Sequence, residues 1–324
     1  MDTIFGINVL RNIKGVGKSA FYKKYFEALK NIDSIEKLKS LILKNESRIT
    51  SLDVEEAVRI AEALCDRYKR FTDIKIITVY DKEYPQRLNV MGNKRPQVLY
   101  VKGNLEALNK DNIAVIGTRT PSELSKRDEE RLVSGILQHS DRVVVSGLAL
   151  GCDSIAHKTV VNDNRITIAV LPCGVNNIVP ASNRKLAEDI LKSNGCLVSE
   201  YEPNAAASKY MFVERDEIVA ALSDITFVVE CGMNSGTMHT ARAAMEFCRR
   251  LACFHPDGDV EGQFAGNEYL IDGKQAYKVT GIDDLIKLLN ETPLVRTKES
   301  EDHEEHQMTI EEWLIHGHTC VSDQ

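Results

Sequence analysis

Four predicted strands each end in a turn rich in glycine, serine, threonine or arginine, a composition that suits the binding of a phosphate. Glycine lets the backbone approach a ligand closely, and the unpaired amides at the start of a following helix attract anions. An arginine side chain can add two parallel hydrogen bonds to a phosphate. The four segments are 112–119, 143–157, 167–180 and 224–240. The candidate phosphate-binding residues in their turns are Gly117, Thr118, Arg119, Ser146, Gly147, Leu148, Gly174, Ser235, Gly236 and Thr237.

Other polar residues near these turns have two interpretations. Asp153 and His157 are one turn apart on the same face of a predicted helix, where we expect them to brace the preceding loop. A set of basic residues could form a cationic rim around a phosphate site, although each of them alone could equally be a solvated surface charge. The rim candidates are Lys158, Arg184, Lys185 and Arg215.

Glu200 and Glu230 each end a predicted strand near the same edge of the sheet. Two carboxylates at one site can perform general acid–base chemistry. However, no spacing fixes their separation, and no nucleophile with an adjacent base is evident in the sequence. We therefore expect these two residues to orient other groups, and we predict no catalytic residue and no enzymatic activity. Without paired Cys or His ligands, we expect no metal ion and no cofactor.

The alternation of strand, turn and helix predicts an α/β domain with a mainly parallel sheet over residues 73–292. Residues 1–72 have apolar residues at helical spacing on both sides of the sequence KGVGK (14–18), which is typical of a helix-hairpin-helix domain. The amides of such a turn can bind a DNA phosphate, or the turn can be a tight connection without a ligand. Residues 293–324 form a third segment, an acidic tail with a short predicted helix around Trp313.

Composition limits the classes of protein and of partner. The 324 residues carry a formal net charge of −7. Residues 295–324 hold two basic and eight acidic residues, so subtracting their −6 from −7 leaves −1 for the rest, which is compatible with a local basic groove. The eight cysteines form no Cys-x-x-Cys pair, which favours reduced thiols in a cytoplasmic protein. The chain has no run of 18 apolar residues and no secretory signal pattern, so we expect no membrane contact.

Several of these motifs together resemble the DprA/Smf family of DNA-processing proteins. The resemblance covers residues 84–276 and implies an extended Rossmann-like fold that binds single-stranded DNA in a basic pocket, dimerises, and helps to load the RecA recombinase during natural transformation. The small helical domain, helix-hairpin-helix or SAM-like, also fits the family. The resemblance adds Asn183 to the phosphate-binding candidates. It is carried by Tyr84-Pro85, Gly117-Thr118-Arg119, Ser146-Gly147-Leu148-Ala149, Gly151, Asp153, His157, Gly174, Pro180, Asn183, Ser199-Glu200, Ser235-Gly236-Thr237 and Gly266-Asn267.

One segment departs from the family pattern. Family members usually have Phe-Pro-x-Arg-Asn-Arg where residues 212–217 read FVERDE, so Asp216 and Glu217 replace an asparagine and an arginine. If this segment forms a turn that faces phosphate, both carboxylates weaken binding. Two other functions therefore stay open. One is a DprA-like antitoxin or sensor that binds a toxin or effector protein in phage defence, and the other is a protein that binds or hydrolyses a small nucleotide.

Overall fold

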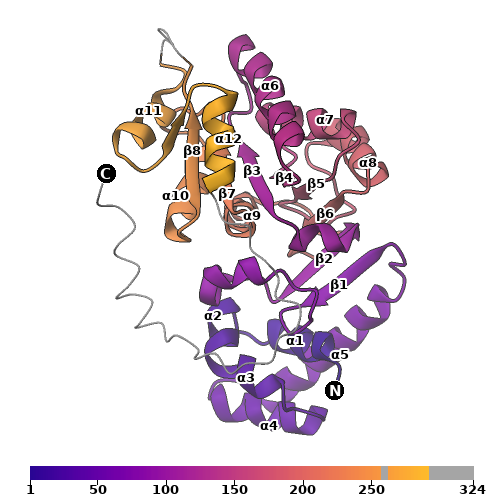
Figure 1. Cartoon of the computed structure of the whole chain (residues 1–324). Helices are drawn as coiled ribbons and strands as arrows, with labels where there is room; N and C mark the ends of the chain where they lie inside the picture. The colour runs from indigo at the N-terminus through magenta and orange to yellow at the C-terminus, as the bar shows by residue number, and fades with distance from the viewer. Residues whose placement is uncertain (257–261, 292–324) are drawn as a thin grey trace, which may run out of the picture. The chain divides into compact units, whose positions relative to one another are not determined.

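The computed structural model describes residues 1–256 and 262–291 (Figure 1). The helix predicted around Trp313 and the acidic tail lie outside these residues. The first 68 residues are helical, as the periodicity predicts. A capping box starts the longest of these helices, because Thr50 and Asp53 bond each other's backbone amides. The helices are α1 (Thr3–Arg11), α2 (Lys18–Ala20), α3 (Phe26–Leu29), α4 (Ile35–Asn45) and α5 (Ser51–Tyr68), with a π-helical turn over Phe21–Tyr25 between α2 and α3.

The predicted hairpin lies between α1 and α2. Gly15 adopts a φ of 92°, a left-handed conformation that favours glycine. Lys18, the last residue of the KGVGK motif, bonds the carboxylates of Glu200 at 2.5 Å and Glu214 at 3.2 Å. Since Glu200 is buried, this contact ties the hairpin to the α/β part of the chain.

The sheet has nine strands in the order β1-β2-β6-β5-β4-β3-β7-β8-β9. The seven strands from β6 to β9 in this order are parallel, whereas β1 and β2 pair antiparallel at one edge. After β3 the chain adds β4, β5 and β6 on one side of this strand, and then β7, β8 and β9 on its other side. The crevice beside the carboxyl end of β3 is therefore a topological switch point. This is the mainly parallel, Rossmann-like α/β fold that the sequence predicts. The strands are β1 (Ile74–Thr78), β2 (Val98–Gly103), β3 (Asn112–Ile116), β4 (Val143–Ser146), β5 (Thr167–Val170), β6 (Cys196–Ser199), β7 (Ile225–Val228), β8 (Arg250–Phe254) and β9 (Tyr277–Val279).

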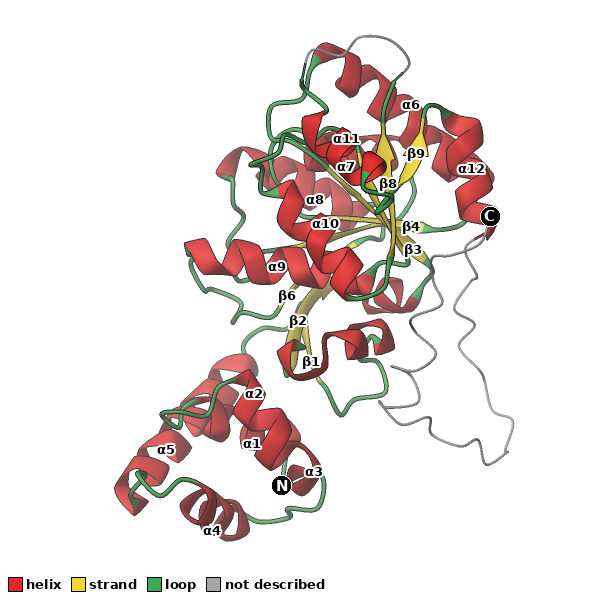
Figure 2. Cartoon of the chain, turned by 90° about the vertical axis from the view of Figure 1, so that its left-hand side faces the viewer, coloured by secondary structure: helices red, strands yellow, loops and turns green. Residues whose placement is uncertain are grey.

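Helices cover both faces of the sheet (Figure 2). Ile113 and Val115 of β3 pack in one core cluster with α6, α7 and α12, while Ala114 and Ile116 pack in another with α9 and α10. None of the helices within residues 1–256 and 262–291 is long and apolar enough to cross a membrane. The helices of this part are α6 (Glu123–His139), α7 (Cys152–Asn162), α8 (Arg184–Lys192), α9 (Lys209–Leu222), α10 (Thr237–Glu246), α11 (Ala265–Asp272) and α12 (Ile282–Glu291), with 3-10 segments over Gln86–Lys94, Leu105–Asn109 and Ala181–Asn183.

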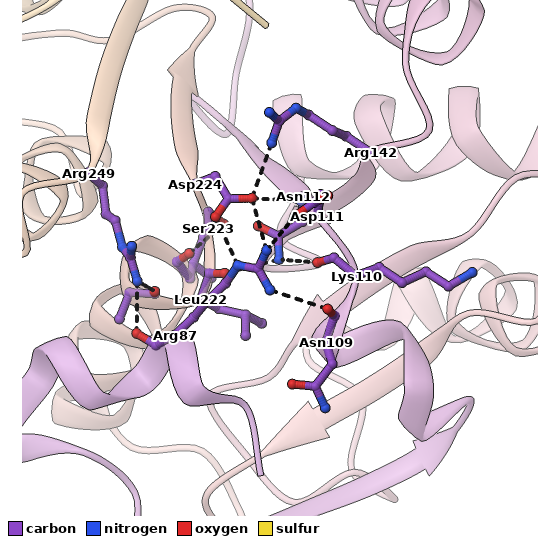
Figure 3. A network of polar contacts seen from close by, with 12 residues as sticks. Arg87, Asn109, Lys110, Asp111, Asn112, Arg142, Leu222, Ser223, Asp224 and Arg249 are labelled. Atoms are coloured by element: carbon purple, nitrogen blue, oxygen red, sulfur yellow. Dashed lines mark hydrogen bonds and ion pairs between the residues drawn. The ribbon is translucent and has the colours of Figure 1, made fainter. Parts of the chain in front are cut away.

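A buried ionic network joins the amino ends of three parallel strands to the segment Gln86–Lys94 (Figure 3). Asp224, just before β7, accepts hydrogen bonds from Arg87 at 2.9 Å, from Arg142 at 3.1 Å and from the Asn112 amide at 3.1 Å. Arg87 also bonds Asp111 at 2.7 Å. The network lies at the amino ends of these strands, whereas the glycine-rich turns follow their carboxyl ends. We therefore assign the network a structural role.

Candidate functional site

A pocket of about 440 Å³ opens at the carboxyl ends of β3 and β4, between these strands and helices α9 and α10. It lies at the switch point of the sheet, the usual place for a ligand in an open α/β fold. Three of the four predicted turns contribute to it, and the turn that contains Gly174 does not. Its lining residues are Ile116, Gly117, Thr118, Arg119, Gly147, Ala149, Asp153, Arg215, Asp216, Val219, Ser235, Gly236, Thr237 and Thr240.

The turn after β3 supplies an available cation. A side chain at Gly117 would overlap the Cys152 sulfur atom, so only glycine fits there. The Thr118 amide donates to the Glu230 carbonyl at 2.8 Å, which fixes the path of the turn. Arg119 is exposed, its guanidinium lies 5.5 Å from the centre of the Phe212 ring, and it forms no ion pair within the described chain. Arg119 is therefore free to bind an anion, as its position after a strand predicts.

The turn after β4 has its own donors occupied. The carboxylate of Asp153 accepts hydrogen bonds from the Gly147 and Ala149 amides, both at 3.1 Å. The Ser146 hydroxyl is buried and donates to the Val115 carbonyl at 2.7 Å. Leu148 is buried as well and points into the core. Asp153 thus braces the loop as expected, but it also takes the amides that we had expected to be open to a phosphate.

Arg215 does not belong to a cationic rim. From the sequence, residues 212–217 were a candidate turn before a helix, but they lie inside α9, and Arg215 is buried beneath the turn after β4. Its guanidinium donates to the carbonyls of Gly147 and Val170 and to the Asp216 carboxylate at 2.8 Å. Those bonds hold the carboxyl ends of β4 and β5 against α9. Sequence alone could not show this, because an arginine among charged residues reads as a surface group.

The two family departures have different surroundings. Asp216 lines the pocket, and burial raises the pKa of its carboxyl while Arg215 lowers it. Glu217 faces away from the pocket and lies 3.6 Å from the Lys94 amine. Of the two substitutions, only Asp216 therefore changes the wall of the site.

The turn before α10 offers backbone donors. The Gly236 and Thr237 amides make no hydrogen bond to another backbone group in the described residues, as is usual at the start of a helix. Nothing lies within 4 Å of the position that a side chain at Gly236 would occupy. The Ser235 hydroxyl contacts the Cys231 sulfur at 3.1 Å. Thr240 also lines the pocket, although it was not among the candidates from the sequence. Its spacing of three residues from Thr237 places both side chains on one helix face and could have indicated it.

The remaining candidates lie outside the pocket lining. Asn183 is buried and donates to the carbonyls of Leu148 and Ala149 at 2.9 and 3.2 Å, so it holds the loop rather than facing a ligand. The Gly174 amide donates to the Ala205 carbonyl at 2.9 Å. The three exposed basic candidates, which lie on α7 and α8, are Lys158, Arg184 and Lys185.

The buried titratable candidates act within the fold. His157 bonds the Thr167 hydroxyl at 2.7 Å, and burial, followed by the charge of Arg215, lowers its pKa to about 3. Glu230 caps α6 by accepting from the Ser122 amide at 2.9 Å and its hydroxyl at 2.7 Å. Burial raises the pKa of Glu200 while Lys18 opposes this effect. Among residues 1–256 and 262–291, no group of His, Cys, Asp and Glu side chains is arranged to hold a metal ion.

Comparison with known proteins places this site in a family. The profile of the family described as DNA recombination-mediator protein A matches residues 75–290. A protein Smf from Borreliella burgdorferi is 30% identical over 254 residues, which cover 78% of this chain and 77% of the relative. The DNA processing protein DprA of Streptococcus pneumoniae is 31% identical over 217 residues, covering 67% of this chain and 75% of that protein.

Two solved structures share the fold. The DprA structure from Streptococcus pneumoniae has a TM-score of 0.75 at 26% identity, and the match covers 90% of this chain and 99% of that one. DNA processing protein A from Helicobacter pylori, described for its single-stranded DNA binding mode, has a TM-score of 0.59 at 29% identity. That match covers 67% of this chain and 96% of the other.

Proposed function

Since the chain belongs to the DNA recombination-mediator protein A family, we propose that it binds single-stranded DNA in the pocket beside β3 and β4. The observation that carries this proposal is that one pocket is lined by an exposed cation and by free backbone donors. Arg119 has no ion-pair partner in the described chain, and the amides of Gly236 and Thr237 have no backbone partner there. Cations and helix-start amides are the usual ligands of a nucleic acid backbone.

We further propose that the protein binds DNA without a chemical reaction. Neither of the carboxylates first considered for acid–base chemistry lines the pocket, since Glu200 bonds Lys18 and Glu230 caps α6. One oxygen of the Asp153 carboxylate, Oδ2, accepts hydrogen bonds from two backbone amides, which fixes this side chain within the loop. These contacts favour a binding role.

The cellular setting is proposed from the family. The function that fits best is that of a cytoplasmic recombination mediator in natural transformation, which binds single-stranded DNA as a homodimer and assists loading of RecA. A dimer would double the number of contacts with one strand, and this avidity would compensate for a pocket that offers few free cations. The division into a helical domain over 1–72, an α/β domain over 73–292 and a tail over 293–324 remains part of the proposal.

Fluorescence anisotropy with a labelled single-stranded 15-mer tests the binding proposal. We expect Arg119→Ala to weaken binding about tenfold and to reduce the slope of log K against log salt by about 0.7, because one phosphate contact is lost. Arg59→Ala is a charge-matched control, since Arg59 lies on α5 with a side chain 70% exposed and forms an ion pair with Glu56 on the same helix. An unchanged affinity in Arg119→Ala contradicts the proposed site. Binding of a mononucleotide but of no oligonucleotide would instead favour a small-nucleotide function.

A further inference from the structure

The pocket contains a hydrogen-bond acceptor that a DNA backbone cannot use. One oxygen of the Asp216 carboxylate accepts from Arg215 at 2.8 Å, and the other makes no hydrogen bond to a described residue. The Asp216 side chain is 19% exposed and lines the pocket, so this second oxygen is available to a ligand there. Asp153, the other acidic residue of the lining, bonds two amides through its Oδ2 atom and is buried, with only 8% of its surface exposed.

The lining therefore combines groups that prefer opposite partners. Arg119 and the amides of Gly236 and Thr237 donate hydrogen bonds and suit phosphate oxygens. The free oxygen of Asp216 accepts, and its negative charge repels a phosphate. The ring of Phe212 lies next to two arginines: the guanidinium carbon of Arg119 is 5.5 Å from the ring centre, and that of Arg215 is 6.0 Å from it. A nucleotide matches this combination, because it carries acceptors on the phosphate and donors on the base.

We propose that Asp216 determines base specificity, so that the pocket prefers a DNA base with an exocyclic amino group over thymine. The inference rests on the proposed function, because it assumes that the pocket holds single-stranded DNA. Cytosine, adenine and guanine each present an amino group that donates to a carboxylate, as acidic side chains accept from cytosine in duplex recognition. Thymine has only its ring N–H, which two carbonyl oxygens flank, and these oxygens repel the carboxylate.

Affinities for labelled dC15 and dT15, measured by anisotropy at one salt concentration near pH 7.5, test this inference. We expect the wild-type protein to bind dC15 about tenfold more tightly than dT15, which is the lower end of the range for a hydrogen bond to a charged group. In Asp216→Asn the amide offers a donor as well as an acceptor, so the ratio of the two affinities should fall towards one. Glu217→Gln is the matched control, because it removes the same charge from the neighbouring residue, which pairs with Lys94 outside the pocket.

The outcomes separate this inference from the proposed function. If dC15 and dT15 bind the wild-type protein tightly and equally, base recognition is wrong and single-strand binding stands. If neither oligonucleotide binds, the proposed function itself fails. If Asp216→Asn tightens both oligonucleotides by the same factor as Glu217→Gln, Asp216 acts only through its charge and the inference is overturned. If Asp216→Asn does not fold, the wild-type ratio still tests the inference, because a ratio of one overturns it.

Discussion

Asp224 is the acceptor that two buried arginines share, and replacing it by alanine tests how much this network stabilises the fold (Figure 3). The side chains of Asp224, Arg87 and Arg142 are 4%, 6% and 2% exposed, so water cannot replace the lost carboxylate. Removing one partner of a buried ion pair costs about 3–5 kcal/mol of unfolding free energy. Arg87 keeps Asp111 and the Asn109 carbonyl, so we expect a value near the lower limit, about 3 kcal/mol.

Thermal unfolding followed by circular dichroism at about 222 nm measures this loss. For a chain of 324 residues, with an unfolding entropy of about 2.1 cal/mol/K per residue, 3 kcal/mol corresponds to a decrease in Tm of about 4–5 °C. Asp224→Asn keeps the shape of the side chain and should lie between wild type and Asp224→Ala. Glu246→Ala is the control, because Glu246 forms an ion pair with Lys94 at 2.8 Å in which both side chains are about half exposed, and such pairs contribute about 0–1 kcal/mol. A Tm for Asp224→Ala within 2 °C of that for Glu246→Ala would refute the reasoning.

Two further predictions concern buried titratable groups. Glu129 is fully buried, and burial raises its pKa well above 4.5, an effect that its hydrogen bond with the Cys152 thiol opposes only in part. The protonated side chain therefore contributes stability that is present below pH 4.5 and is lost as the pH rises, at up to about 1.4 kcal/mol per pH unit. Glu129→Gln should unfold at a higher Tm than wild type at pH 8 but not at pH 5. An equal Tm of the two proteins at pH 8 would contradict a raised pKa of Glu129. The pKa of His157 is lowered to about 3, so the unfolded chain binds the proton more strongly between pH 6.5 and 3 and stability falls as the pH decreases through this range. We expect His157→Gln to show a smaller loss of Tm between pH 6.5 and 5 than wild type, whereas parallel pH profiles would contradict the assignment.

The local pattern of the sequence predicted the main strands and their turns. The apolar runs that end at Ile116, Ser146, Val170 and Val228 are strands β3, β4, β5 and β7. These elements can be predicted because a buried parallel strand needs a continuous apolar run, and because a turn that approaches another backbone needs glycine. Gly117 illustrates the second point, since the Cys152 side chain leaves no room for a larger residue.

The edge of the sheet and the buried ionic network were not predictable in this way. The antiparallel strand β1 was not among the four predicted strands, because its pairing with β2 depends on a partner about 25 residues later rather than on a local pattern. Arg87 and Asp224 are 137 residues apart in the chain, and nothing near either residue indicates the other.

For the pocket, the sequence predicted the types of residue present, and the structure showed which of them are free to bind a ligand. Glycines, Arg119 and the helix start at Thr237 were visible as types and spacings, because each depends on its immediate neighbours. Only the tertiary structure decided which polar groups remain free, because hydrogen-bond partners come from distant segments. Arg215 is bonded to the Gly147 carbonyl, 68 residues away, and so is held within the fold, while Asp216 next to it keeps one oxygen open. A side chain's type follows from the sequence, but its availability follows from the partners that folding brings to it.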